Sequence, residues 1–181
     1  MNILIITGSP REGSNSTKLA EEFARGAKEN GHLISLINAG NAKVNPCKAC
    51  NYCRSNIGSC VINDDFPIMR PQILNADVIA FASPIYYFSI SAQLKCVIDR
   101  FYGLNTLKDK MFGNKKCVLL TVQGQKSPYA SIPSMAMYQD ILGLYQWEDL
   151  GQIHACGIAA AEAVNGTDYL RQAYELGKSI K

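Results

Sequence analysis

Small polar side chains gather directly after the first apolar run of the chain. Residues 3–6 are all aliphatic, and the sequence GSPR at 8–11 follows them before hydroxyl and amide residues open a helical pattern. This order predicts a strand, a tight loop and the start of a helix. Such a loop directs backbone N–H groups and hydroxyls at one point, with the positive end of the helix dipole behind them. It is therefore suited to bind an anion, and above all a phosphate.

The residues of this loop narrow the kind of phosphate. The glycines at 8 and 13 have the spacing of a Walker A loop, but Ser and Asn stand at 14 and 15, where that loop requires Lys and then Ser or Thr. The GxGxxG fingerprint of dinucleotide sites is also absent. A capped turn without a ligand is the alternative, because hydroxyl residues favour helix N-caps for structural reasons alone. We expect a monophosphate, bound by Ser9, Arg11, Ser14, Asn15, Ser16 and Thr17.

Four cysteines within fourteen residues form a second group that could do chemistry: Cys47, Cys50, Cys53 and Cys60. An iron-sulfur cubane needs four converging thiolates, and bacterial cluster loops use the same spacing of two residues between ligands. Structural zinc usually draws two such pairs from separate knuckles, so zinc fits less well. The four thiols could instead carry thiol or disulfide redox chemistry, or have no special role. The remaining cysteines lie in apolar segments and are expected to pack in the core.

The elements that must position these groups alternate between strand and helix patterns. After the first strand we expect helices at 15–29, 66–75 (broken near Pro71), 91–102, 134–146 and 167–180, and strands at 32–38, 77–83, 115–122 and 152–159. The cysteines lie in an insertion at about 39–65. The alternation, together with the Ser/Thr-rich first loop, predicts a single α/β domain over 1–181, with a flavodoxin-like, five-stranded parallel sheet of order 2-1-3-4-5 and helices on both faces.

That strand order places a ligand outside the carboxyl ends of strands one, three and four. The third strand ends in an apolar and aromatic segment that could lie against a flat ring, although aromatic residues there could instead be core: Ser83, Pro84, Ile85, Tyr86, Tyr87 and Phe88. The fourth ends in Gln123 and Gly124. A phosphate anchor with a flat-ring platform about one ligand's length away indicates FMN.

Composition disfavours several classes of partner. The net charge is only +3, and the longest basic run is Lys115-Lys116, so neither a nucleic acid nor a membrane surface is expected as a partner. No apolar run approaches the roughly 18 residues of a membrane span, and no targeting segment opens the chain. We expect a cytoplasmic protein.

Three segments together resemble the iron-sulfur flavoproteins and the wider NADPH-dependent FMN reductase group of the flavodoxin superfamily. They are GSPREGSNS at 8–16, CKACNYCRSNIGSCVINDD at 47–65 and SPIYYFSISAQLKCVIDR at 83–100. The resemblance implies non-covalent FMN, with its phosphate held by the first segment and its ring by the third, in a homodimer or homotetramer. It also implies a [4Fe-4S] cluster near the flavin, bound by Cys47, Cys50, Cys53 and Cys60.

These features predict an FMN-dependent oxidoreductase or electron-transfer flavoprotein that passes electrons between FMN and the cluster. The alternative is a flavin-only NAD(P)H-dependent reductase of FMN, quinones or azo dyes. A rival from another class is a zinc-stabilised interaction module that has lost FMN. NAD(P)H or a ferredoxin-type protein is the expected donor, and a small molecule or a protein the acceptor. No catalytic side chain is expected, because the cofactor carries the chemistry.

Overall fold

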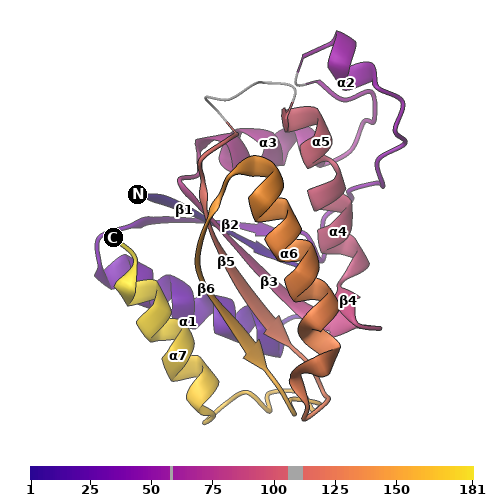
Figure 1. Ribbon diagram of the computed structural model, residues 1–181. Coiled ribbons are helices and arrows are strands. Elements are labelled where there is room, and N and C mark those ends of the chain that lie inside the picture. The colour runs from indigo at the N-terminus through magenta and orange to yellow at the C-terminus, as the bar shows by residue number, and fades with distance from the viewer. Residues whose placement is uncertain (58, 106–111) are drawn as a thin grey trace.

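A parallel sheet forms the centre of the computed structural model, which describes residues 1–57, 59–105 and 112–181 (Figure 1). Its parallel strands are β1 (Asn2–Thr7), β2 (Leu33–Asn38), β3 (Val78–Tyr86), β5 (Lys116–Val122) and β6 (Glu148–Ala155). They lie in the order β2-β1-β3-β5-β6. This is the predicted flavodoxin-like order once β4 is set aside, so the fold class is confirmed.

A sixth strand in the described part of the sheet, β4 (Ser89–Ile90), corrects the expected number of five. It pairs antiparallel with the end of β3. The intervening Tyr87 and Phe88 both have left-handed backbone angles, with φ of 46° and 67°. Because tight hairpin turns of this kind are usually made by Gly, Asn or Asp, two aromatic residues give no turn signal in the sequence.

Helices cover both faces of the sheet, as predicted (Figure 1). One face carries α1 (Asn15–Glu29) and α7 (Asp168–Ser179), and the other carries α3 (Phe66–Asn75), α4 (Ala92–Asp99), α5 (Phe101–Leu104) and α6 (Ile132–Tyr145). Successive side chains of a strand point to opposite faces, so Ile3 and Ile5 belong to one core and Leu4 and Ile6 to the other. None of the described helices is long and apolar enough to cross a membrane.

Two predicted helices differ from those observed. The expected break near Pro71 is absent, and α3 runs through it with Phe66, Met69 and Ile73 buried on one side. Burial of this side outweighs the single hydrogen bond that proline cannot donate. The helix expected at 91–102 is instead divided at Arg100 into α4 and α5.

The last strand also begins earlier than predicted, at Glu148 instead of 152, and ends at Ala155. β6 is an edge strand, and its first two residues, Glu148 and Asp149, are exposed and polar, so its beginning lacks the apolar run that is typical of a buried strand. The pairing of Cys117 with Asp149 and of Val118 with Gly151 leaves Leu150 as an extra residue of β6, and the neighbouring Gly151 has φ of 143°. Similarly, α6 begins at Ile132 rather than at 134.

Two glycines allow α1 and α7 to pack with their backbones in contact. A Cβ atom added to Gly26 would lie 2.0 Å from the carbonyl oxygen of Tyr174, and one added to Gly177 would lie 2.0 Å from that of Phe23. Real Cβ atoms do not approach backbone so closely, so any larger residue would push the helices apart.

Replacing Gly26 by alanine is therefore expected to destabilise the protein by about 1–3 kcal/mol, since overpacking forces a backbone shift. Gly143→Ala is the matched control, because a Cβ at Gly143 in α6 meets nothing within 4 Å and alanine favours a helix by about 1 kcal/mol. Urea denaturation measures the free energy of unfolding of both variants, which should fall in Gly26→Ala and rise in Gly143→Ala. A gain in stability in Gly26→Ala would contradict the close packing.

A buried ion pair ties the cysteine insertion at 39–65 to the end of α4. Arg100 Nη1 lies 2.8 Å from Asp64 Oδ2, and the two side chains are only 2% and 1% exposed. Arg100 also donates to the carbonyl of Asn45, at 3.1 Å, and its guanidinium lies over the ring of Phe66. Asp64 accepts further hydrogen bonds from the backbone N–H groups of Asn45 and Phe66. The pair thus holds both ends of the segment that carries the four cysteines.

Asp64→Asn is expected to lower the free energy of unfolding by about 3 kcal/mol at pH 7, because it leaves the buried guanidinium without its counter-charge. Burial acts to raise the pKa of Asp64, but hydrogen bonds from Arg100 and from backbone N–H groups outweigh it and hold the pKa below its ordinary value. The stabilisation is therefore present above about pH 4 and is lost as the pH falls through the folded-state pKa.

Urea denaturation of wild type and variant at pH 7 and in acid tests both statements, since the difference between them should shrink in acid. Asp99→Asn is the control on the same helix. Its pair with Lys95 is 2.5 Å long but exposed, and such pairs contribute about 0.5 kcal/mol. Equal losses in the two variants would contradict the anchoring role of Asp64.

Candidate functional site

The loop after β1 borders a cavity of about 320 Å³ at the carboxyl ends of the strands. The N–H of Gly8 donates to the carbonyl of Ala82 in β3, at 2.8 Å, and a Cβ at Gly8 would lie 2.5 Å from Ser91 Oγ. Only glycine lets the loop pass so close to the start of α4. α1 then begins after Ser14, whose Oγ accepts from the N–H of Thr17 at 3.2 Å. The cavity therefore faces a capped helix N-terminus.

The structure brings five of the six predicted phosphate ligands to this cavity: Ser9, Arg11, Ser14, Asn15 and Ser16. The sixth, Thr17, instead places its hydroxyl 2.9 Å from that of Ser14. The amide of Asn15 is occupied by backbone, because it donates to the carbonyl of Ala160 at 2.9 Å and accepts from the N–H of Val164 at 3.2 Å. The side chain of Asn15 thus holds the segment after β6.

The predicted ring-binding segment divides into residues inside the cavity and residues outside it. Pro84, Ile85 and Tyr86 line the cavity. Ser83 is buried, donates to the carbonyl of Pro84 and accepts from the N–H of Ser91, so it fixes the start of α4. Tyr87 is 98% exposed at the hairpin tip, and neither it nor Phe88 lines the cavity.

The far wall comes from residues that follow β5 and β6. Gln123 and Gly124 line it as predicted, together with four residues that the sequence did not reveal: Ile158, Ala159, Ala161 and Glu162. The signal that could have found them is topological, because β6 lies beside β5 and its carboxyl end must open on the same edge of the sheet.

Charges of both signs border the cavity. Arg11, Glu12 and Glu162 line it, and Lys18 Nζ lies 3.1 Å from Glu162 Oε1 and 3.1 Å from Asn165 Oδ1. The charge of Lys18 thus offsets the negative charge of Glu162, one of the two carboxylates that line the cavity. Arg11 and the N-terminus of α1 therefore leave the polar end of the cavity attractive to an anion.

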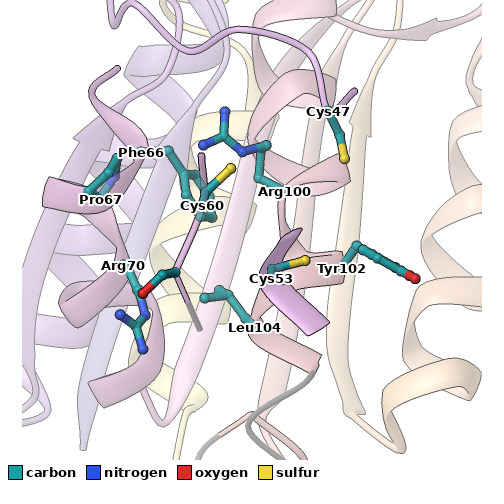
Figure 2. Close-up of a pocket in the computed structure, with 11 residues that line it drawn as sticks. Cys47, Cys53, Cys60, Phe66, Pro67, Arg70, Arg100, Tyr102 and Leu104 are labelled. Atoms are coloured by element: carbon teal, nitrogen blue, oxygen red, sulfur yellow. The ribbon is translucent and has the colours of Figure 1, made fainter. Parts of the chain in front are cut away.

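The cysteine segment borders a different cavity, of about 220 Å³. Figure 2 shows Cys47, Cys53 and Cys60 around it, with Arg70 and Arg100 in its walls. Cys50 is exposed and does not line it. Within the described ranges no cysteine forms a disulfide, and no three His, Cys, Asp or Glu side chains are arranged to hold a metal ion.

The environment of these thiols is apolar but includes positive charge. Burial raises the pKa of the Cys53 thiol, and the neighbouring thiols raise it further. The Nε atom of Arg70 is buried and makes no hydrogen bond within the described part of the chain. A bound cation reverses the preference of such thiols for the protonated form, so the donor set suits a thiolate-ligated metal chemically.

The two cavities lie at opposite ends of α4 and α5. Ser91, the N-cap of α4, contacts the loop after β1, whereas Arg100 and Gly103 line the cysteine cavity. At about 1.5 Å of helix rise per residue, roughly 18 Å separate Ser91 from Gly103. The expectation of a cluster near the flavin stays a prediction.

Known proteins resemble this chain in both sequence and structure. The family model described as NADPH-dependent FMN reductase matches residues 1–137. An iron-sulfur flavoprotein of Methanocaldococcus jannaschii is 28% identical over 99% of this chain and 95% of its own length, and one of Methanosarcina thermophila is 37% identical over 70% and 65%.

The solved structure of an NAD(P)H:quinone oxidoreductase from Methanothermobacter marburgensis superposes with a TM-score of 0.76. The match covers 98% of this chain and 94% of that chain at 21% identity, which supports the fold. The family model and the named relatives all indicate a flavin-dependent oxidoreductase, and the fold places a cavity where proteins of this fold class bind ligands, at the carboxyl ends of the strands. The chain belongs to the NADPH-dependent FMN reductase family and is a flavin-dependent oxidoreductase.

Proposed function

We propose that the chain binds FMN in the cavity at the carboxyl ends of the strands and transfers electrons from NAD(P)H to a small-molecule or protein acceptor. The observation that carries this proposal is a single cavity with an anion-binding end and an apolar end. Ser9, Arg11 and the first turn of α1 border the first end, and Pro84, Ile85 and Tyr86 border the second. A flavin mononucleotide has the same division between phosphate and ring.

The residues present fit such a ligand. Gly13 lines the cavity with φ of 56°, and a Cβ there would meet nothing within 4 Å, so the loop leaves open space at this point. Ser9 is only 3% exposed and supplies a buried hydroxyl. When bound, FMN supplies one-electron and two-electron chemistry, and the protein contributes binding, orientation and electrostatics.

Arg11→Gln is expected to weaken FMN binding about tenfold or more, since a charge-assisted hydrogen bond contributes about 1.5–3 kcal/mol. Riboflavin, which lacks the phosphate, should bind the variant and the wild type equally. Lys28→Gln is the matched control, because it removes one positive charge at the other end of α1. Fluorescence titration of each apoprotein measures the dissociation constants of FMN and of riboflavin. A wild-type chain that binds neither flavin would contradict the proposal.

We further propose that Cys47, Cys50, Cys53 and Cys60 bind a [4Fe-4S] cluster. Three of these thiols border one cavity, and Arg70 supplies positive charge beside it, whereas the charge of Arg100 is paired with Asp64. Positive charge suits an anionic thiolate cluster, and several relatives that match this chain are named iron-sulfur flavoproteins. We also propose a homodimer or homotetramer, in which electrons pass between the cavity at the carboxyl ends of the strands and the cysteine cavity of another chain.

Protein purified without oxygen is expected to contain about four iron and four sulfide per FMN. Cys53→Ser and Cys60→Ser should lose most of the iron and keep FMN, because their sulfurs would be ligands. Cys96→Ser is the control, since this cysteine lies on α4 and does not line the cysteine cavity.

Iron, acid-labile sulfide, zinc and FMN contents are the measurements. FMN without metal would favour the flavin-only NAD(P)H-dependent reductase, with a quinone, azo dye or free flavin as acceptor. Zinc without FMN would instead favour an interaction module. If the protein contains the cluster, a ferredoxin-type protein is the second electron donor to test, beside NAD(P)H.

A further inference from the structure

A buried carboxamide holds the segment 124–131, which follows β5 beside the flavin cavity. Gln123 is 3% exposed, and its Nε2 donates to the carbonyls of Ser127, at 2.6 Å, and Gln125, at 3.3 Å. Its Oε1 accepts from Ser131 Oγ at 2.5 Å, and Ser131 is fully buried. Nε2 also lies 3.4 Å from Cys156 Sγ. One side chain therefore joins both ends of the segment to β5 and to the end of β6.

The segment carries an aromatic side chain that meets the β3–β4 hairpin. Its short helix η2 (Pro128–Ser131) presents Tyr129, whose ring centroid lies 5.9 Å from that of Phe88. Phe88 lies in the hairpin turn, and its carbonyl accepts from Ser134 Oγ at 3.5 Å, in α6. The two residues are about half exposed, at 48% and 46%, so burial alone does not fix their side chains.

The position of this aromatic pair relates it to the cavity. Gln123 and Gly124 line the cavity on one side and Tyr86 lines it on another. The segment 124–131 leaves from the first of these walls, and Phe88 follows two residues after the second. The contact between Tyr129 and Phe88 thus connects the segment 124–131 with the β3–β4 hairpin.

We propose that Gln123 is a positioning residue for the flavin ring. It acts by fixing the segment 124–131, which in turn holds Tyr129 against Phe88 and keeps the ring end of the cavity closed on that side. The sequence predicted Gln123 as a direct cofactor contact, whereas its amide hydrogen-bonds within the protein. This inference rests on the proposed binding of FMN in this cavity.

The chemistry of the contacts requires an amide at this position. Nε2 faces carbonyl oxygens and Oε1 faces a hydroxyl, so the group must donate at one end and accept at the other. A carboxylate of the same shape has no hydrogen to donate and would repel the carbonyl oxygens. A protonated carboxyl group has one hydrogen and could restore one of these bonds.

Gln123→Glu is therefore expected to weaken FMN binding about tenfold or more at pH 8, with partial recovery as the pH falls and the carboxyl group protonates. The quantity to follow is the ratio of the FMN dissociation constants of variant and wild type at each pH, which cancels the titration of the phosphate. Gln125→Glu is the matched control, because the same change is made two residues away at an exposed side chain. Its ratio should stay near one at every pH.

Visible circular dichroism of the bound flavin is the second readout, and Gln123→Glu should change it where Gln125→Glu does not. Ser131→Ala removes only the hydroxyl that Oε1 accepts from, and it carries the same test if Gln123→Glu does not fold. It should weaken FMN binding several-fold with no pH dependence of the ratio.

Two results would overturn the positioning role: wild-type affinity in the folded Gln123→Glu variant, or a loss of affinity with the same ratio at every pH. For Ser131→Ala, unchanged affinity would do so. A wild-type chain that binds no FMN would instead contradict the proposed function on which this role rests.

Discussion

The parallel pairing of β1 with β3 and of β3 with β5 is the constraint on which the proposed flavin cavity depends. Thr7 of β1 lies opposite Ala82 of β3, and Pro84 of β3 lies opposite Val122 of β5. Because the three strands run in the same direction and in this register, the loops that follow them leave from one edge of the sheet. The close passage of Gly8 to Ser91 then joins the first loop to α4. Loops from distant parts of the chain thus border one cavity as a consequence of strand pairing.

The line of α4 and α5 connects the two regions in which chemistry is expected. At its start, Ser91 caps the helix beside the flavin cavity, and at the end of α4, Arg100 holds the cysteine insertion through Asp64. The buried pair of Arg100 and Asp64 can persist only because each charge has further hydrogen bonds, since an unpaired buried charge is costly. The helices α4 and α5 therefore contact both regions, with the cavity at the carboxyl ends of the strands beside the start of α4 and the cysteine cavity beside α5.

Several polar side chains in and beside the cavity at the carboxyl ends of the strands hydrogen-bond within the protein and support its walls. Asn15 binds backbone groups of the segment after β6, Ser83 binds the start of α4, and Gln123 binds the segment after β5. Buried amides and hydroxyls must find partners, and in a loop the nearest partners are backbone groups. A polar residue at the edge of such a site can thus be essential to its shape without touching the ligand.

The sequence by itself determined the features that depend on local periodicity and spacing: the strand and helix alternation, the order of the parallel strands, the capped loop after β1 and the clustering of four cysteines. It could not determine the β3–β4 hairpin, the polar beginning of β6 or the residues near Glu162 in the cavity wall, because these follow from pairing between distant segments. Only the tertiary structure decided that Asn15 and Gln123 are bound to backbone, and that the cysteine cavity lies at the far end of α4. The physical reason is that a side chain's partners are set by the segments brought next to it, whereas its own neighbours in sequence set only its conformational preference.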